Sequence, residues 1–331
     1  MSTYPRRRIL GAAAGVTAAA ALPLTMATSA GAAERREPWA AVPDPVPVPL
    51  DALYDNDGID TASARGGDFD GSGYTFPGEE LPAGRVVVDG VPFLFPASTA
   101  GARNNLVALG QRLDLPQGRY LSAFFLTAAS YGNASGRATV HYADGTTTTA
   151  GLGGSDWYAA GGPLSAPYRH RPDGGRDEHG VGIGVAEVWL DPRREAVAVT
   201  LPVTNPAEAN KASLHVFALT LQPVAAGRAL ALRAPHSTPS LLDPSGAQSA
   251  EATVVNAGTV AVLAADGVSV AVDVPGARTV QPARVRRLDP GEQARVRIGI
   301  RNRPGTPPGT RRDGTVTVTG RGARGPRARR R

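Results

Sequence analysis

Carboxylates concentrate in two short segments, 54–60 and 67–74, which are therefore the first candidates for metal binding or for acid–base catalysis. Carboxylate and carbonyl oxygens are the ligands that Ca²⁺ prefers. The first segment departs from the EF-hand pattern, because its glycine comes early and Gly66 occupies the position of the final glutamate. Asx turns within loops are therefore the first interpretation, and a structural calcium ion is the alternative. Its candidate ligands are Asp55, Asp57, Asp60, Asp68 and Asp70.

Asp68 and Asp70 are also the nearest approach to a catalytic carboxylate pair. Two residues apart in an extended segment, they are close for a glycosidase pair, which needs about 5 Å or more with the sugar between. Ser72 does not form a nucleophile elbow, because Asp70 stands where the motif has its first glycine. The five histidines form no H-E-x-x-H motif, and the absence of cysteine excludes thiol catalysis and disulfides. We therefore assign no catalytic residue.

Aromatic residues are only 5% of the chain, so their placement is informative. Trp157 and Tyr158 follow a Gly-rich run at 151–154, and Tyr168 comes soon after. A loop that presents these rings could stack on the apolar face of a pyranose, so all three are candidate carbohydrate-binding residues. The alternative for Trp157 is a core position behind a hairpin expected at 138–149.

The hydrophobic pattern from residue 50 onward has period two, which indicates strands. Apolar runs at 86–88 and 91–95 flank Asp89-Gly90, a two-residue hairpin turn. In 214–221 both alternating sets of side chains are largely apolar, which predicts a strand buried on two sides. With 40 Gly and 29 Pro between short strands, the pattern indicates an all-β protein with a sandwich or jelly roll followed by a small immunoglobulin-like sandwich.

Composition shifts divide the chain into six predicted parts. They are a signal peptide at 1–33, a Pro-rich linker at 34–49, a first sandwich at 50–223, a linker at 224–247, an immunoglobulin-like sandwich at 248–320 and a disordered Arg-rich tail at 321–331. In the leader, Arg6-Arg7-Arg8 precedes an apolar run at 11–24 and a cleavage pattern at Ala30-Gly31-Ala32. This favours export by the twin-arginine route, since the run is shorter than the roughly 20 residues of a membrane span.

The net charge of +6 comes from the two ends of the chain. The leader holds three arginines in a row, and the last 21 residues hold eight Arg and one Asp, which leaves 34–310 with a net charge of −4. A mildly acidic body without a basic stripe excludes nucleic acid as the expected partner. We expect a secreted monomer with no membrane association beyond the export signal.

Five motifs carry a resemblance to a known family. They are YDNDGI at 54–59, GDFDGSGY at 67–74, VDGVPF at 88–93, HYADGT at 141–146 and SDW at 155–157. These motifs resemble the galactose-binding-like sandwich attached to secreted bacterial glycosidases. The unit at 248–320 is similar to the immunoglobulin-like module that accompanies that sandwich. Together, residues 50–315 resemble the N-terminal half of a secreted α-L-fucosidase-type glycoside hydrolase.

The resemblance implies a carbohydrate partner, either a glycan or a polysaccharide, and no catalytic residue. The catalytic carboxylates of such an enzyme lie in a barrel that follows the two sandwiches, whereas this chain passes into an Arg-rich tail. We expect a non-catalytic carbohydrate-binding or positioning region, produced by truncation or a frameshift. The alternatives are a glycosidase that uses Asp68 and Asp70, and a purely structural spacer. The sugar and its linkage stay open.

Overall fold

The computed structural model describes residues 39–98, 101–159, 161–204, 211–233, 247–273, 277–281, 283–302, 315–321 and 327–329. The predicted signal peptide at 1–33 lies outside the described residues. Apart from two 3₁₀ turns, η1 (Trp157–Ala159) and η2 (Ala264–Asp266), the named elements are all β-strands, so the all-β prediction is confirmed. None of the helices in the described ranges has the length and apolarity needed to cross a membrane.

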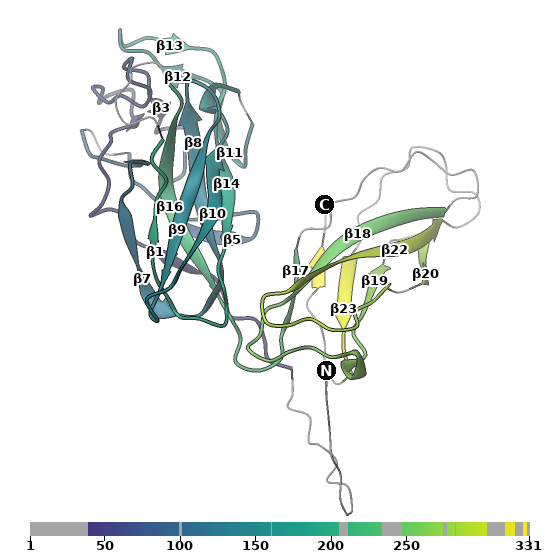
Figure 1. Ribbon diagram of the computed structural model, residues 1–331. Helices are drawn as coiled ribbons and strands as arrows, with labels where there is room; N and C mark the ends of the chain where they lie inside the picture. Colours follow the sequence, from purple (N-terminus) through teal and green to yellow (C-terminus); the bar gives the residue numbers. More distant parts are fainter. Residues whose placement is uncertain are drawn as a thin grey trace, which may run out of the picture. The chain divides into compact units, whose positions relative to one another are not determined.

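The first sandwich consists of two antiparallel sheets (Figure 1). Sheet one has the order β1 (Val46–Val48), β16 (Ser213–Pro223), β8 (Tyr120–Ser130), β14 (Val181–Trp189) and β11 (Leu164–Ala166), with β6 (Leu106–Val107) also paired to β16. Sheet two has the order β10 (Thr147–Gly154), β9 (Ala134–Tyr142), β15 (Ala196–Thr200) and β7 (Arg112–Gly118).

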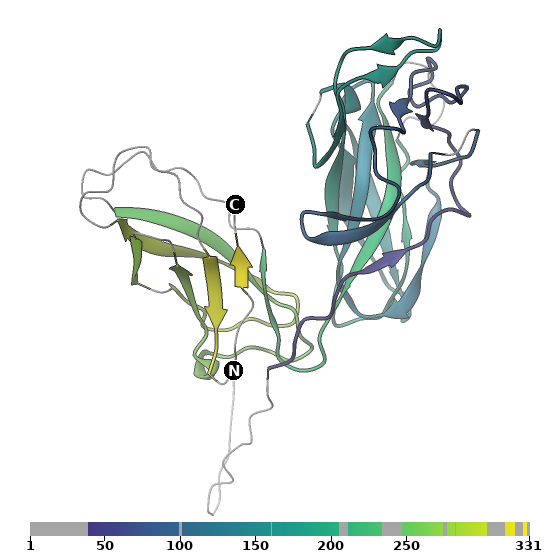
Figure 2. The same ribbon diagram turned by 180° about the vertical axis from the view of Figure 1, so that it is seen from behind.

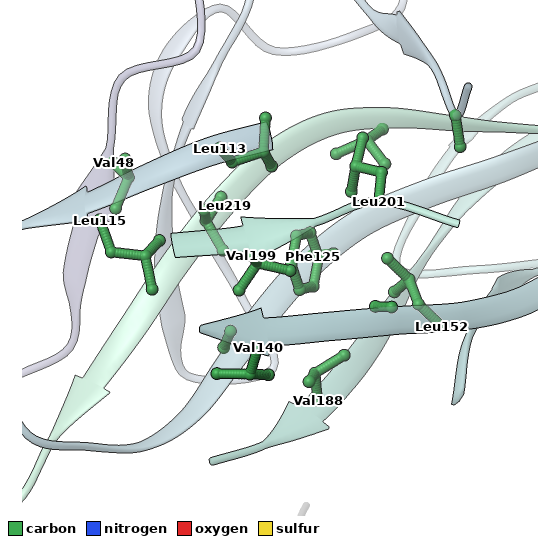
Figure 3. Packing of buried hydrophobic residues seen from close by; sticks show 14 of the residues in the cluster. Val48, Leu113, Leu115, Phe125, Val140, Leu152, Val188, Val199, Leu201 and Leu219 are labelled. Carbon is green, nitrogen blue, oxygen red and sulfur yellow. The ribbon is translucent and has the colours of Figure 1, made fainter. Parts of the chain in front are cut away.

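Sheet one is buried on both faces because each face has its own cover. Between the two sheets lies a mostly aliphatic inner cluster, part of which is drawn in Figure 3. It includes Leu113, Phe125, Val140, Val199 and Leu219. Short strands and loops cover the opposite face with an aromatic outer cluster. It includes Phe69, Phe76, Phe93, Trp157 and Phe217.

A β-bulge in β16 changes which side chains face each cluster. Val216 pairs with Thr127 and Ala218 with Leu126, so Phe217 is the extra residue. A strict alternation predicts Leu219 on the same face as His215 and Phe217. Instead, Leu219 joins the inner cluster and Phe217 the outer one, because a bulge shifts the alternation by one residue. The predicted burial of this strand on both sides is confirmed.

Short elements complete the cover of the outer face. The predicted Asp89-Gly90 hairpin is confirmed, with both residues at positive φ between β4 (Gly84–Val88) and β5 (Val91–Phe95). The hairpin predicted at 138–149 is also confirmed, since β9 pairs with β10 across the turn at Asp144-Gly145. The short strands are β2 (Ile59–Asp60), β3 (Phe76–Pro77), β4 (Gly84–Val88), β5 (Val91–Phe95), β12 (Arg169–His170) and β13 (Arg176–Asp177).

The second sandwich consists of two four-stranded sheets around an aliphatic core that includes Val254, Val270, Leu288, Ile298 and Val318. One sheet has the order β17 (Leu230–Arg233), β18 (Ala247–Asn256), β22 (Gln293–Asn302) and β20 (Ala277–Gln281). The other has the order β21 (Ala283–Arg284), β19 (Ser269–Asp273), β23 (Thr315–Thr319) and β24 (Arg327–Arg329).

Three strands lie where the sequence predicts linkers or a disordered tail. Strand β1 falls in the Pro-rich segment, β17 in the segment 224–247, and β24 in the Arg-rich tail. All three are at the ends of their sheets, and Figure 2 shows β1, in purple, at its sheet edge. An edge strand pairs on one side only, so it tolerates proline and needs little apolar periodicity. This explains why the pattern missed them.

Candidate functional site

A polar pocket of about 260 Å³ lies at one end of the first sandwich, where β8 ends and β16 begins. Its walls come from the Asn56 loop, the Gly-Asp loop at 67–74, β6, and the facing ends of β8 and β16. The lining residues are Asn56, Asp68, Phe69, Asp70, Gly71, Val107, Ser130, Lys211, Ser213 and His215.

Asp68 holds the Gly-Asp loop in its turn. Its Oδ1 accepts hydrogen bonds from the backbone N–H groups of Gly71 at 2.6 Å and Gly73 at 2.9 Å. Both glycines have φ near +80°, a region that glycine adopts without steric cost. No partner for Asp68 Oδ2 occurs among the residues that the structure describes, so this oxygen is available to a ligand.

Asp70 anchors the same loop to β12. Its Oδ1 accepts the Ser72 N–H at 3.0 Å, and its Oδ2 lies 3.6 Å from Arg169 Nη1. Burial raises the pKa of Asp70 above its ordinary value, while the backbone hydrogen bonds and Arg169 act in the opposite direction. Arg169 also pairs with Asp177 at 2.8 Å and lies over the Tyr74 ring at 3.8 Å. Asp70 is therefore committed to holding the loop.

His215 forms a buried wall of the pocket. Its ring is 2% exposed and packs on Phe69, with the ring centroids 4.0 Å apart. Its Nδ1 lies 2.9 Å from Asn105 Oδ1, whereas its Nε2 is buried without a hydrogen-bond partner. Burial lowers the pKa of His215 to about 3. The imidazole is therefore neutral at physiological pH.

Tyr131 stands beside the pocket in an unusual backbone conformation. It follows Ser130, and its hydroxyl lies 2.6 Å from Ser72 Oγ, next to Gly71. Its φ of 54° is rare for a bulky residue, and the side chain is 38% exposed. Strain of this kind is a recognised marker of a functional position. The ring is an exposed aromatic surface at the edge of a polar pocket.

The five predicted calcium ligands do not gather at one point. Asp68 and Asp70 line the pocket, while Asp55 accepts the Val107 N–H and a bond from Gln111. Asp60 accepts hydrogen bonds from the backbone N–H groups of Gly66 and Gly67, and Asp57 accepts one from Asn104 Nδ2. Within the described ranges, no three acidic or histidine side chains are grouped to hold a metal ion. The geometry is that of separate side-chain-stabilised loops, and calcium binding stays a prediction.

Two of the three predicted sugar-stacking residues are buried, which corrects their assignment and, for Trp157, confirms the alternative of a core position. Trp157 is 2% exposed and packs against both Phe69 and Phe76, at centroid distances of 4.5 and 4.7 Å. Tyr168 is 3% exposed and donates its hydroxyl to Glu79 at 3.0 Å. Neither ring has an open face for a sugar, because Trp157 belongs to the outer cluster and the Arg176 guanidinium lies 4.1 Å from the centroid of the Tyr168 ring.

Tyr158, the third candidate, is 38% exposed but already has aromatic partners. Its ring stacks on His179 with the centroids 3.6 Å apart, and the Arg169 guanidinium lies 4.4 Å from its centroid. Tyr131 has the freer ring, and sequence reasoning missed it. The available signal was an aromatic residue before a glycine at a strand end. For His215, the signal was a histidine inside an otherwise apolar strand.

Comparisons with solved structures give distant similarities. A GH2 beta-galacturonidase from Eisenbergiella tayi, bound to galacturonate, is 14% identical with a TM-score of 0.29, over 65% of this chain and 34% of that one. The glycoside hydrolase domain of Endo-D from Streptococcus pneumoniae R6 is 14% identical with a TM-score of 0.21, over 78% and 36%. Tripeptidyl peptidase 2 is 12% identical with a TM-score of 0.23, over 67% and 22%. The chain thus spans about a third of the first two proteins.

No curated protein matches the sequence. One protein family does match part of it, over residues 44–162, which include the Gly-Asp loop and Ser130 but end before His215. This stretch of the first sandwich is similar to the AziU2-like beta-sandwich domain.

Proposed function

We propose that the first sandwich is a non-catalytic carbohydrate-binding region of a secreted glycoside hydrolase, and that a sugar occupies the pocket at the end of β8 and β16. The observation that carries the proposal is a polar pocket flanked by an exposed, conformationally strained aromatic residue, Tyr131. Sugar sites combine these two features, because a pyranose has hydroxyl groups around its rim and apolar C–H groups on its faces.

The pocket offers groups that suit hydroxyl recognition. Asp68 Oδ2 can accept a hydrogen bond, Ser130 and Ser213 carry hydroxyls, and His215 has a free ring nitrogen. The volume of about 260 Å³ suits a single sugar unit better than a longer chain. A larger glycan would extend from the pocket over Tyr131.

The non-catalytic assignment rests on the position of the two carboxylates and on the hydrogen bonds that they accept. Asp68 and Asp70 belong to one short loop, and each binds backbone N–H groups of that loop. A glycosidase pair flanks the scissile bond from separate positions. The α-L-fucosidase-type parent and twin-arginine export are parts of the same proposal, and they rest on the motifs at 54–157 and on the leader at 1–33.

Sugar titration of the full chain tests the proposal. Fucose, galactose, glucose and soluble polysaccharides are added to labelled protein, and chemical-shift changes are followed by NMR. We expect Tyr131→Ala to weaken binding, by about tenfold for the loss of one stacking ring. Tyr131→Phe keeps the ring and should retain most of the affinity. Tyr158→Ala is the matched control, since Tyr158 is equally exposed but its ring already stacks on His179, whereas Tyr131 directly follows the pocket residue Ser130.

Two results would overturn the proposal. If no sugar in the panel shifts any resonance of the pocket residues, the pocket is not a carbohydrate site. If the purified chain hydrolyses an aryl fucoside at an enzyme-like rate, and Asp68→Ala abolishes this while the protein stays folded, the chain is a glycosidase.

A further inference from the structure

We propose that His215 determines specificity in this pocket, and that its Nε2 accepts a hydrogen bond from one hydroxyl of a neutral sugar. This inference rests on the proposed function and adds the chemistry of recognition. It starts from a buried ring nitrogen without a partner, in a side chain that is 2% exposed and lines the pocket.

The tautomer of His215 follows from a chain of hydrogen bonds that begins at a backbone carbonyl. Asn105 Nδ2 lies 3.3 Å from the Asn56 carbonyl oxygen and 3.0 Å from Asn104 Oδ1. A carbonyl oxygen can only accept, so the amide nitrogen of Asn105 must face it and donate. The Oδ1 of Asn105 then faces His215 Nδ1 at 2.9 Å. Because this oxygen accepts, Nδ1 must carry the proton.

The orientation of Asn104 is fixed in the same way. Its Oδ1 accepts the Gly58 N–H at 2.8 Å, and its Nδ2 donates to the carbonyl of Ile59 at 3.1 Å. Backbone groups thus fix the hydrogen bonds of both asparagines, so only one orientation of each side-chain amide is consistent with them. A neutral imidazole has a single N–H, and it lies on Nδ1. Nε2 is left as an acceptor only.

A buried acceptor without a donor is unfavourable, and a ligand hydroxyl would relieve it. The rest of the lining selects among donors. The lining holds the carboxylates of Asp68 and Asp70 and the ammonium group of Lys211, while Arg169 pairs with both Asp70 and Asp177, so carboxylates outnumber cations around the pocket. This balance disfavours an anionic ligand. A neutral sugar provides a hydroxyl donor without adding a negative charge.

The direct test observes the His215 ring nitrogens by long-range ¹H–¹⁵N NMR in histidine-labelled full-length protein. In the free protein we expect Nδ1 protonated and Nε2 unprotonated. Addition of a binding sugar should shift the Nε2 resonance toward a hydrogen-bonded value. A series of deoxy sugars should then contain one member that binds more weakly and leaves Nε2 unshifted.

Substitution provides the second test. His215→Phe keeps a ring against Phe69 but removes the acceptor, so sugar affinity should fall by about 3- to 10-fold, as expected for one hydrogen bond. The critical deoxy sugar should bind this variant as well as the parent sugar does. His170→Phe is the matched control: His170 is also a buried histidine with a free ring nitrogen, and it does not line the pocket. The His170→Phe variant should change sugar affinity by less than about twofold.

The outcomes separate this inference from the proposed function. If a sugar binds but the Nε2 resonance does not move, or Nε2 is protonated in the free protein, the role of His215 is refuted and the carbohydrate site stands. If no sugar binds, both fail. If His215→Phe does not fold, the NMR measurement on the unmodified protein still decides.

Discussion

The two faces of sheet one in the first sandwich pack against different partners, and the difference explains where the pocket lies. Its inner face meets another sheet through aliphatic side chains such as Leu113 and Val199. Its outer face meets loops and short strands through aromatic side chains such as Phe69 and Trp157. The bulge at Phe217 lies in the strand that both clusters share. Regular strands thus build a uniform core on one side, while irregular segments on the other side leave room for a pocket.

The outer cluster should contribute as much stability as the inner one. Trp157→Ala should lower the free energy of unfolding by about 3–5 kcal/mol and Leu113→Ala by about 2–5 kcal/mol, because each removes a fully buried side chain. Denaturant titration measures both. If Trp157→Ala costs less than about 1 kcal/mol, the loops are a loosely attached cover and not part of the core.

Acid should destabilise the outer side through its buried histidine. Unfolded His215 takes up a proton below its ordinary pKa of 6.5, whereas the folded pKa is about 3 because of burial. Protons therefore favour the unfolded state between these two values, and this group lowers the free energy of unfolding by about 1.4 kcal/mol per pH unit as pH falls. Unfolding titrations from pH 7 to 4 measure this slope.

His215→Phe is the control for the pH effect. It should have a shallower slope, so the stabilities of wild type and variant converge in acid. Parallel slopes would show that His215 is protonated in the folded protein or exposed to solvent, contrary to its buried position.

A backbone test distinguishes the strained loop from a regular strand. Gly71→Ala should cost about 1–2 kcal/mol, because φ is +80° there and an L side chain is disfavoured even though a Cβ would meet nothing within 4 Å. Gly151→Ala in β10 also meets open space, but its φ lies outside the positive region. It should be close to neutral or slightly stabilising. Equal effects in thermal melts would contradict the structural role of the Gly-Asp loop.

Calcium removal should have the smallest effect. Each of the five aspartates already accepts hydrogen bonds within the loops. A chelator should therefore change stability by less than about 1 kcal/mol, which is a shift of roughly 2–4 °C in Tm for a protein region of this size. Thermal melts with and without EDTA measure it. A drop of many degrees would reveal a structural calcium ion that holds the outer loops.

The sequence alone determined the all-β class, the two Asp-Gly hairpins and the double burial of β16. These features depend on local patterns: period-two hydrophobicity and turns that need positive φ. Residues 214–221 are apolar on both faces, so burial on two sides follows for any sheet in which they pair. The Asp-rich loops were also recognisable as turns, because their side-chain oxygens bind backbone N–H groups only a few residues away.

Which polar and aromatic residues form the site depends on tertiary contacts. Trp157 and Tyr158 are neighbours in the sequence, yet one is buried and the other exposed. Asp68, Ser130 and His215 meet because a loop crosses the ends of two paired strands. The bulge at Phe217 decides which of the following side chains face inward, and nothing in the local pattern marks it. Pocket and burial arise from contacts between segments up to about 150 residues apart, and the free energy of those contacts depends on how the loops pack together.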